Sequence, residues 1–178
     1  MNMNICIFGS YLEQNDETRS SVIRLGRLLG QKGYTIVSGG FGGIMEYISQ
    51  GAKEAGGKTI GVTFYKKGKK ADGGPNQYID EEVITDSVLH RIERMIELSD
   101  AFIAFPGGTG TLLELATILE FKNKRLMPDK PLILVGYYWQ GILKTIEPLA
   151  PNSAKLVRIV EGVDEVEGAI EQSADHSR

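Results

Sequence analysis

Residues 101–122 read AFIAFPGGTGTLLELATILEFK, and this stretch decides the fold. Its first five residues, Ala101 to Phe105, are apolar and predict a strand that is buried on both faces. A glycine-rich turn, Pro106 to Thr111, follows the strand directly. The turn leads into a predicted helix over 111–124, which places four apolar side chains on one face: Leu112, Leu115, Ile118 and Leu119. A buried strand, a tight turn and a helix in this order are typical of a parallel sheet covered by helices.

The same order repeats along the whole chain. Short apolar runs rich in β-branched residues predict strands at 4–8, 34–38, 59–63, 83–85, 101–105, 132–135 and 157–160. Stretches of helical period predict helices at 16–32, 44–55, 87–98, 111–124, 140–149 and 164–172. We therefore expect an α/β fold with a single doubly wound, mainly parallel sheet of six or seven strands and helices on both faces, which is Rossmann-like. Residues 1–173 form one nucleotide-binding domain in this prediction, and the polar tail 174–178 is expected to be disordered.

Composition limits the classes of partner. The 178 residues carry 20 basic and 23 acidic side chains, a net charge of -3, so no overall field attracts nucleic acid or an anionic membrane. No segment has the length and apolarity of a membrane span or a signal peptide. The one cysteine, Cys6, lies in an apolar run and is expected to be a buried hydrophobe. We expect a cytoplasmic protein with no metal site and no bound cofactor.

Three glycine turns each follow a predicted strand: Gly9-Ser10, Gly39 to Gly43, and Gly107 to Thr111. The carboxyl ends of parallel strands lie at one edge of the sheet, where open α/β folds bind ligands. Glycines allow close backbone approach, and the first N–H groups of a helix attract phosphate. Any one turn could be only a tight connection, but the three together predict a phosphate or nucleotide site. Its candidate residues are Gly9, Ser10, Gly40, Gly42, Gly43, Met45, Gly107, Gly108, Thr109, Gly110 and Thr111.

Two common nucleotide fingerprints do not fit these turns. Thr111 is preceded by Gly110 rather than by a lysine, so the pattern of a P-loop NTPase is absent. The run Gly39 to Gly43 follows the second strand rather than the first, and no ribose-binding acid stands in the expected context, which disfavours NAD.

Glu114 and Arg91 are the candidate catalytic residues. Thr111 and Glu114 also fit a helix capping box, which would account for both without any chemistry. The helix over 87–98 and the strand after it should run antiparallel, so the strand brings Gly107 back to the level of Arg91. A surface salt bridge of Arg91 with Glu93 or Asp86 is the structural alternative, and it would contribute little stability. Because Arg91 is expected at the same edge of the sheet as the glycine turn, we favour a role in a ligand site over a surface salt bridge.

The stretch HRIERMIELSDAFIAFPGGTGTLLELATIL, together with ICIFGS and SGGFGGIMEYISQGAKEAGG, closely resembles the LONELY GUY (LOG) family over most of residues 4–135. The family signature PGGxGTxxE matches Pro106 to Glu114 without a gap, and Arg91 stands at the position of the family's arginine. The resemblance implies a phosphoribohydrolase that cleaves a nucleoside 5'-monophosphate, AMP or a cytokinin-type N6-substituted AMP, into free base and ribose 5-phosphate. It also implies a homodimer and a small-molecule nucleotide substrate.

Two departures from the family pattern keep a second function open. Ile92 stands where a lysine usually follows the arginine, and the second glycine turn is shorter than the plant-type turn, with Glu46 after Met45. This variant resembles a branch that includes molybdenum-cofactor carrier proteins, so the alternative is a non-catalytic nucleotide or cofactor carrier. No lysine stands in a context typical of pyridoxal phosphate, so we reject a decarboxylase.

Two further segments are interpreted as structural. Residues 64–76, which include the lysines at 66, 67, 69 and 70, are expected to form a mobile surface loop whose lysines are solvated. Tyr137, Tyr138 and Trp139 are expected to serve packing or a dimer contact.

Overall fold

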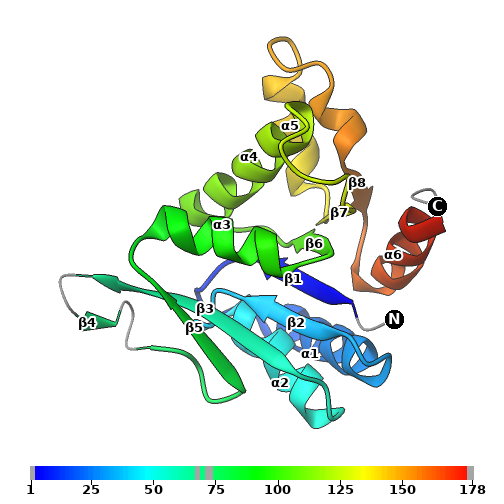
Figure 1. Ribbon diagram of the computed structural model, residues 1–178. Coiled ribbons are helices and arrows are strands. Elements are labelled where there is room, and N and C mark those ends of the chain that lie inside the picture. Colours follow the sequence, from blue (N-terminus) through cyan, green and yellow to red (C-terminus); the bar gives the residue numbers. More distant parts are fainter. Residues whose placement is uncertain (1–2, 67–68, 71–73, 176–178) are drawn as a thin grey trace.

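The computed structural model describes residues 3–66, 69–70 and 74–175, which form a sheet between two layers of helices (Figure 1). The strands are β1 Asn4–Phe8, β2 Thr35–Ser38, β3 Thr59–Lys66, β4 Lys69–Lys70, β5 Glu81–Thr85, β6 Ala101–Ala104, β7 Leu132–Val135 and β8 Arg158–Val160. The α-helices are α1 Asp16–Gln31, α2 Ile44–Glu54, α3 Val88–Leu98, α4 Thr109–Asn123, α5 Tyr138–Ile146 and α6 Val166–Asp175. Two short 3₁₀ helices are η2 Ser153–Leu156 and η3 Val163–Glu165.

The strand order explains where a ligand site can form. Seven strands of the described chain are parallel, in the order β5-β3-β2-β1-β6-β7-β8, and β4 pairs antiparallel with the end of β3. The chain builds outward from β1 through β2 and β3 to β5, and then returns to place β6 on the other side of β1. This reversal between β1 and β6 is the topological switch point, which leaves a crevice at the carboxyl ends of the strands. The predicted doubly wound, mainly parallel sheet is confirmed.

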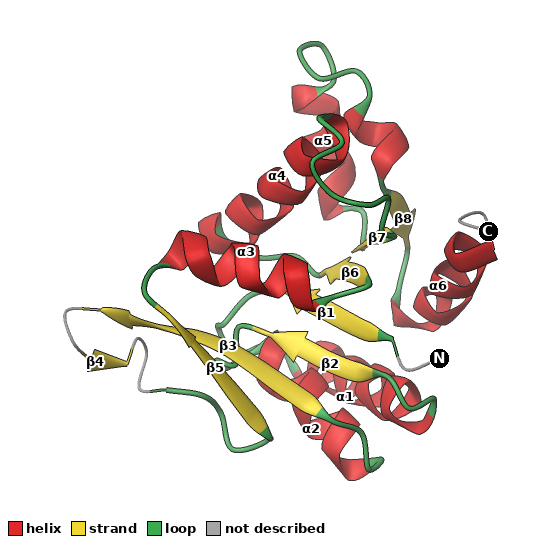
Figure 2. Ribbon diagram, in the orientation of Figure 1, coloured by secondary structure: helices red, strands yellow, loops and turns green. Residues whose placement is uncertain are grey.

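Helices cover both faces of the sheet (Figure 2), and each face has its own apolar core. On one face α1, α2 and α6 pack over the strands, and the core includes Ile7, Ile36 and Ile103. On the other face lie α3, α4 and α5, with Phe8 and Phe102 stacked at a centroid distance of 6.2 Å. Successive residues of a strand point to opposite faces, so strands covered on both faces must be apolar at every position. The continuous apolar runs in the sequence have this cause.

Helices α1 and α2 approach each other through two glycines. A Cβ atom on Gly26 would lie 2.3 Å from the carbonyl oxygen of Ile48, and one on Gly51 would lie 2.0 Å from that of Ile23. Both neighbours are backbone atoms, which cannot rotate away as a side chain can. Glycine is therefore required at this contact, because any side chain would force the two helices apart.

The prediction of a mobile loop over residues 64–76 was partly wrong. Strand β3 continues to Lys66 and pairs with β4, with Tyr65 opposite Lys70. Edge strands tolerate charged residues, so the lysines did not exclude a strand. Residues 67–68 and 71–73 lie outside the described residues. The far end of the segment is tied to the second glycine turn, since the Asn76 amide donates to the carbonyl oxygens of Gly40 at 3.0 Å and Phe41 at 2.9 Å.

Several predicted boundaries also move. Strand β5 begins two residues before the predicted start, at Glu81, and α5 begins at Tyr138 rather than at 140. Helix α6 extends to Asp175, beyond the predicted end at 172, and the rest of the predicted tail lies outside the described residues. The expectation of packing is confirmed for Trp139, which is fully buried in the core beneath α5.

The α1–α2 contact provides a test of the fold. Gly51→Ala adds a Cβ that overlaps the carbonyl of Ile23, and we expect it to lower the free energy of unfolding by about 1–3 kcal/mol. Gly141→Ala is the matched control, because its Cβ would point into open space and alanine favours a helix over glycine. Urea unfolding followed by circular dichroism measures both. Equal stability of the two variants would contradict the close helix contact.

Candidate functional site

The turn between β6 and α4 forms the floor of the site. Helix α4 begins at Thr109, Gly108 is its N-cap, and no side chain caps it. The first backbone hydrogen bond of the helix runs from the N–H of Leu112 to the carbonyl of Gly108, at 3.0 Å. The N–H groups of Thr109, Gly110 and Thr111 precede this bond, so they are available to an anion at the positive end of the helix dipole.

This turn is fixed from both sides. The N–H of Ser10 donates to the carbonyl of Pro106 at 3.3 Å, which joins the turns after β1 and β6. From α5, the Tyr138 hydroxyl donates to the carbonyl of Gly107 at 3.2 Å, and the Trp139 indole N–H donates to that of Ala104 at 3.1 Å. The turn is therefore already ordered, so a ligand that bound there would cost less conformational entropy.

Arg91 reaches the site from α3. The Ser87 hydroxyl caps that helix by accepting from the N–H of His90 at 3.2 Å. The Arg91 side chain is 8% exposed, and its Nε donates to the carbonyl of Val62 at 2.8 Å. Its guanidinium lies over the Phe41 ring, 4.9 Å from the centroid. The alternative of a surface salt bridge with Glu93 or Asp86 is wrong, because the side chain points inward.

Gly39 makes room for this guanidinium. A Cβ atom at Gly39 would lie 1.5 Å from Nη2 of Arg91. The first glycine of the second turn therefore positions Arg91 rather than binding a ligand directly. The sequence contained this signal, but only the packing of α3 against β3 shows which side chain fills the space.

Glu114 faces Arg91 from α4. It is the sixth residue of the helix, so the capping-box interpretation of Thr111 and Glu114 is wrong. The side chain is 9% exposed, and its Oε1 lies 3.6 Å from Nη1 of Arg91. Burial raises the pKa of Glu114 to about 7, although the positive charge of Arg91 opposes the rise. A carboxyl group with a pKa near neutrality inside a pocket is typical of acid–base or electrostatic catalysis.

Arg91 and Glu114 line a pocket of about 410 Å³. Most of the predicted site residues line it: Gly9, Ser10, Met45, Arg91, Gly108, Thr109, Gly110, Thr111 and Glu114. The remaining lining residues were not predicted, and these are Tyr11, Leu12, Phe41 and Phe64. Phe41 lies inside the second glycine turn and so had a signal in the sequence. Phe64 had none, because its place depends on the length of β3.

Four predicted binding residues do not line this pocket. Gly107 packs against Thr111, since a Cβ there would lie 2.2 Å from the threonine hydroxyl oxygen. Gly40 packs against the backbone of Gly61. Gly42 and Gly43 line a neighbouring hollow instead. Gly43 has a positive φ of 62° and sits against the carbonyl oxygens of Ser10 and Leu12, so its role is to shape the backbone.

The fold and the site define a class. This is a Rossmann-like α/β protein with an uncapped helix start and a buried arginine–glutamate pair at its switch point. Residues 45–172 match the family model described as "Possible lysine decarboxylase", and the chain belongs to this family, which includes the LOG proteins. None of the described residues that line the pocket is a lysine, so no side chain there would form a Schiff base with pyridoxal phosphate.

Named relatives have two kinds of description. The "Cytokinin riboside 5'-monophosphate phosphoribohydrolase" of Mycobacterium tuberculosis is 35% identical in an alignment of 153 positions that covers 78% of each chain. A rice relative, "Probable cytokinin riboside 5'-monophosphate phosphoribohydrolase LOGL5", is 31% identical, and the match spans 80% of this chain but 58% of that protein. The solved molybdenum cofactor binding protein of Rippkaea orientalis is 28% identical, with a TM-score of 0.76 and 98% of both chains covered.

The Arg91–Glu114 pair predicts a measurable titration. We expect the ¹³Cδ resonance of Glu114 to titrate near pH 7, and the pKa to be higher still in Arg91→Gln, because the positive charge that stabilises the carboxylate is lost. Arg94→Gln is the matched control on the exposed side of α3, and it should leave the pKa unchanged. A lower or equal pKa in Arg91→Gln would contradict the assigned pair.

Burial of Glu114 also affects stability in a defined direction. Between pH 4.5 and about 7 the folded protein retains a proton that the unfolded chain has released, so stability falls as pH rises through this window. Glu114→Gln removes the titration. We expect its stability relative to the parent to be greater at pH 8 than at pH 4.5, by about 2–3 kcal/mol at most. Urea unfolding at both pH values measures the difference, and a difference of opposite sign would contradict it.

Proposed function

We propose that this protein hydrolyses the N-glycosidic bond of a nucleoside 5'-monophosphate, AMP or an N6-substituted AMP of the cytokinin type, to free base and ribose 5-phosphate. The observation that carries the proposal is the buried Glu114 carboxyl, held beside Arg91 in the same pocket as the first N–H groups of α4. The names of the mycobacterial and rice relatives support the same reaction.

In this proposal the 5'-phosphate is bound by the N–H groups of Thr109, Gly110 and Thr111. That contact lies away from the reacting bond, so its binding energy positions the sugar without taking part in the chemistry. The base occupies the apolar side of the pocket, where Phe41, Met45 and Phe64 form a small cluster. The anomeric carbon then lies between the phosphate turn and Glu114.

The chemistry requires a negative charge near the anomeric carbon. The base departs with the electron pair of the N-glycosidic bond and leaves an oxocarbenium-like ribosyl cation, which the Glu114 carboxylate stabilises while it orients the attacking water. The water adds its hydroxyl group to the anomeric carbon, and its remaining proton balances the charge of the departed base. Arg91 holds the carboxyl in place and lowers its pKa from the value that burial alone would give. Because the ionised form is required, the rate is expected to rise with pH through about 7.

The catalytic proposal is tested by Glu114→Gln. We expect ribose 5-phosphate release from AMP or N6-isopentenyl-AMP to fall by about 10²- to 10³-fold, because the amide cannot stabilise a developing cation. Glu120→Gln, an exposed change two turns further along α4, is the control and should retain full activity. No release from either substrate by the parent protein at high concentration would reject the reaction for those substrates.

The pH profile tests the role of the ionised carboxylate. The kcat/KM of the parent should increase with pH from 5.5 to 8, with a midpoint near the pKa of about 7 for Glu114 in the free protein. The midpoint should be higher in Arg91→Gln, whose Glu114 has lost its positive neighbour. A profile that is flat over this range in the parent would exclude Glu114 as the ionising group.

A second candidate is a non-catalytic carrier of a phosphorylated cofactor. Two observations favour it: the similarity to the Rippkaea orientalis protein over 98% of both chains, and the buried apolar Ile92 beside Arg91 in place of the lysine. A carrier would bind its ligand with equal affinity in the parent and in Glu114→Gln, and would release no product in either. Mass spectrometry of any ligand retained during purification identifies the cargo.

We also propose a homodimer formed through α3 and α4. Val88, Leu89 and Leu113 lie on these helices and are 40%, 62% and 40% exposed, so both helices offer apolar surface to a partner subunit. We expect Leu89→Glu to convert the protein to a monomer in light scattering coupled to gel filtration. Leu126→Glu, an equally exposed change beyond the end of α4, is the control. A parent protein that is already monomeric would contradict the interface.

A further inference from the structure

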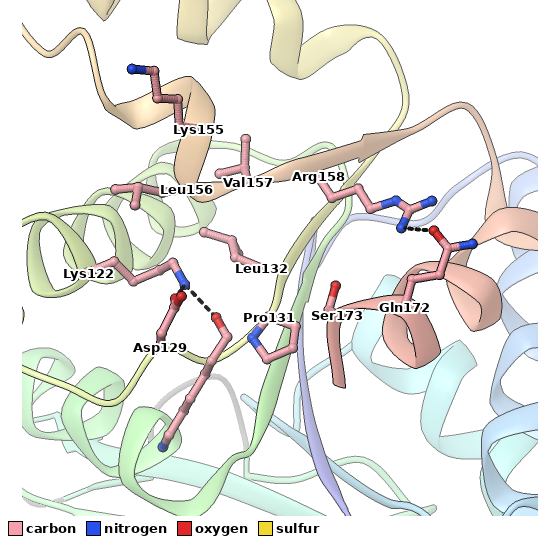
Figure 3. A pocket seen from close by; sticks show the side chains of 11 residues that line it. Lys122, Asp129, Pro131, Leu132, Lys155, Leu156, Val157, Arg158, Gln172 and Ser173 are labelled. Carbon is pink, nitrogen blue, oxygen red and sulfur yellow. Dashed lines mark hydrogen bonds and ion pairs between the residues drawn. The ribbon is translucent and has the colours of Figure 1, made fainter. Parts of the chain in front are cut away.

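A second hollow lies at the opposite edge of the sheet from the candidate active site. It is formed where β7 and β8 begin, around Pro131, Leu132 and Val157, and its volume is about 350 Å³ (Figure 3). Strands of four residues span about 13 Å, so the sheet itself separates the two sites. The two hollows share no lining residue.

Cationic side chains dominate the charge of this hollow. Lys122 extends into it from the last turn of α4, and Arg158 lies on the opposite side at the start of β8, as Figure 3 shows. Lys155 from η2 stands at the rim. Asp129 is the one carboxylate among the lining residues. The concentration of positive charge is local, because the whole chain has a net charge of -3.

Lys122 is the most informative of these side chains. Only 5% of it is exposed, and burial of an ammonium group is costly unless it is paired. Its Nζ donates to the backbone carbonyl of Lys130 at 2.6 Å and forms an ion pair with Asp129. The Asp129 side chain is 90% exposed, so solvent can replace it at little cost. A buried cation thus has an exchangeable anionic partner at the wall of a hollow.

Arg158 and Lys155 have no carboxylate within ion-pair distance among the residues that the structure describes. The guanidinium of Arg158 donates to the amide oxygen of Gln172 at 2.6 Å, which fixes its direction but does not neutralise its charge. A guanidinium held in this way can still bind an oxyanion through its other N–H groups.

We propose that this hollow is a second ligand site, which binds a small oxyanion carrying two or more negative charges. The anion takes the place of Asp129 at Lys122 and is bound from the other side by Arg158, with Lys155 adding charge at the rim. Phosphate-bearing and carboxylate-bearing molecules share this chemistry. The site does not depend on the proposed hydrolase function, since it contains none of the residues of the Glu114 pocket.

The test is a site-resolved NMR titration of the full chain at constant ionic strength, with pyrophosphate in one arm and citrate in the other. We expect saturable shifts of the backbone amides of Lys155 to Arg158 and Gln172 in at least one arm, and the stronger arm shows which oxyanion the site prefers. Arg158→Gln and Lys155→Gln change exposed residues, and each should weaken binding, by about tenfold for Arg158→Gln. Asp129→Asn removes the competing carboxylate and should tighten it.

Arg24→Gln, on the far face of the sheet, is the matched control and should leave the affinity unchanged. Pyrophosphate that binds at the candidate active site is distinguished by shifts of residues 108–111, which the Arg158 change should not affect. The proposal is overturned if the amides of Lys155 to Arg158 and Gln172 show no saturable shift in either arm. It is overturned as well if Arg158→Gln and Asp129→Asn bind the anion with the affinity of the parent. It is also overturned if chloride produces the same shifts at the same concentration.

Discussion

The buried contact between Arg91 and Glu114 is the interaction on which the candidate site depends. Their charged atoms lie 3.6 Å apart, and the two side chains come from different helices on the same face of the sheet. Neither charge is well solvated, so each would be costly without the other. Three contacts hold the Arg91 guanidinium beside Glu114. Gly39 leaves space for it, the Val62 carbonyl accepts a hydrogen bond from its Nε, and the Phe41 ring packs against it.

The fold could be predicted from the sequence because both faces of the sheet are covered. Covered strands are almost continuously apolar, which made β1, β6 and β7 recognisable, and glycine turns at their carboxyl ends marked the edge where the pocket lies. The start of α4 was misplaced by two residues, because the capping pattern at Thr111 was stronger in the sequence than the uncapped start at Thr109. Edge strand β4 was missed, since its pairing comes from backbone atoms rather than from an apolar pattern.

The charged residues of the candidate site could be predicted from the sequence, but several residues that line its pocket could not. Glu114, Arg91 and the glycine turn before α4 followed from spacing and from the antiparallel return of β6 along α3. Tyr11 and Phe64 line the pocket only because of how the loop after β1 and the end of β3 lie in space, which no local pattern encodes. Gly42 and Gly43 fitted a binding motif, yet both lie outside the pocket, and the positive φ and close packing of Gly43 give it a structural role.

We propose that Glu114 and the start of α4 are parts of one phosphate site, and a titration of Glu114 with and without ribose 5-phosphate tests this coupling. A bound phosphate dianion in the same pocket makes ionisation of the carboxyl less favourable. We expect a Glu114 pKa near 7 in the free protein that rises further when ribose 5-phosphate is bound. A pKa near the ordinary glutamate value, or one that saturating ribose 5-phosphate leaves unchanged, would contradict it.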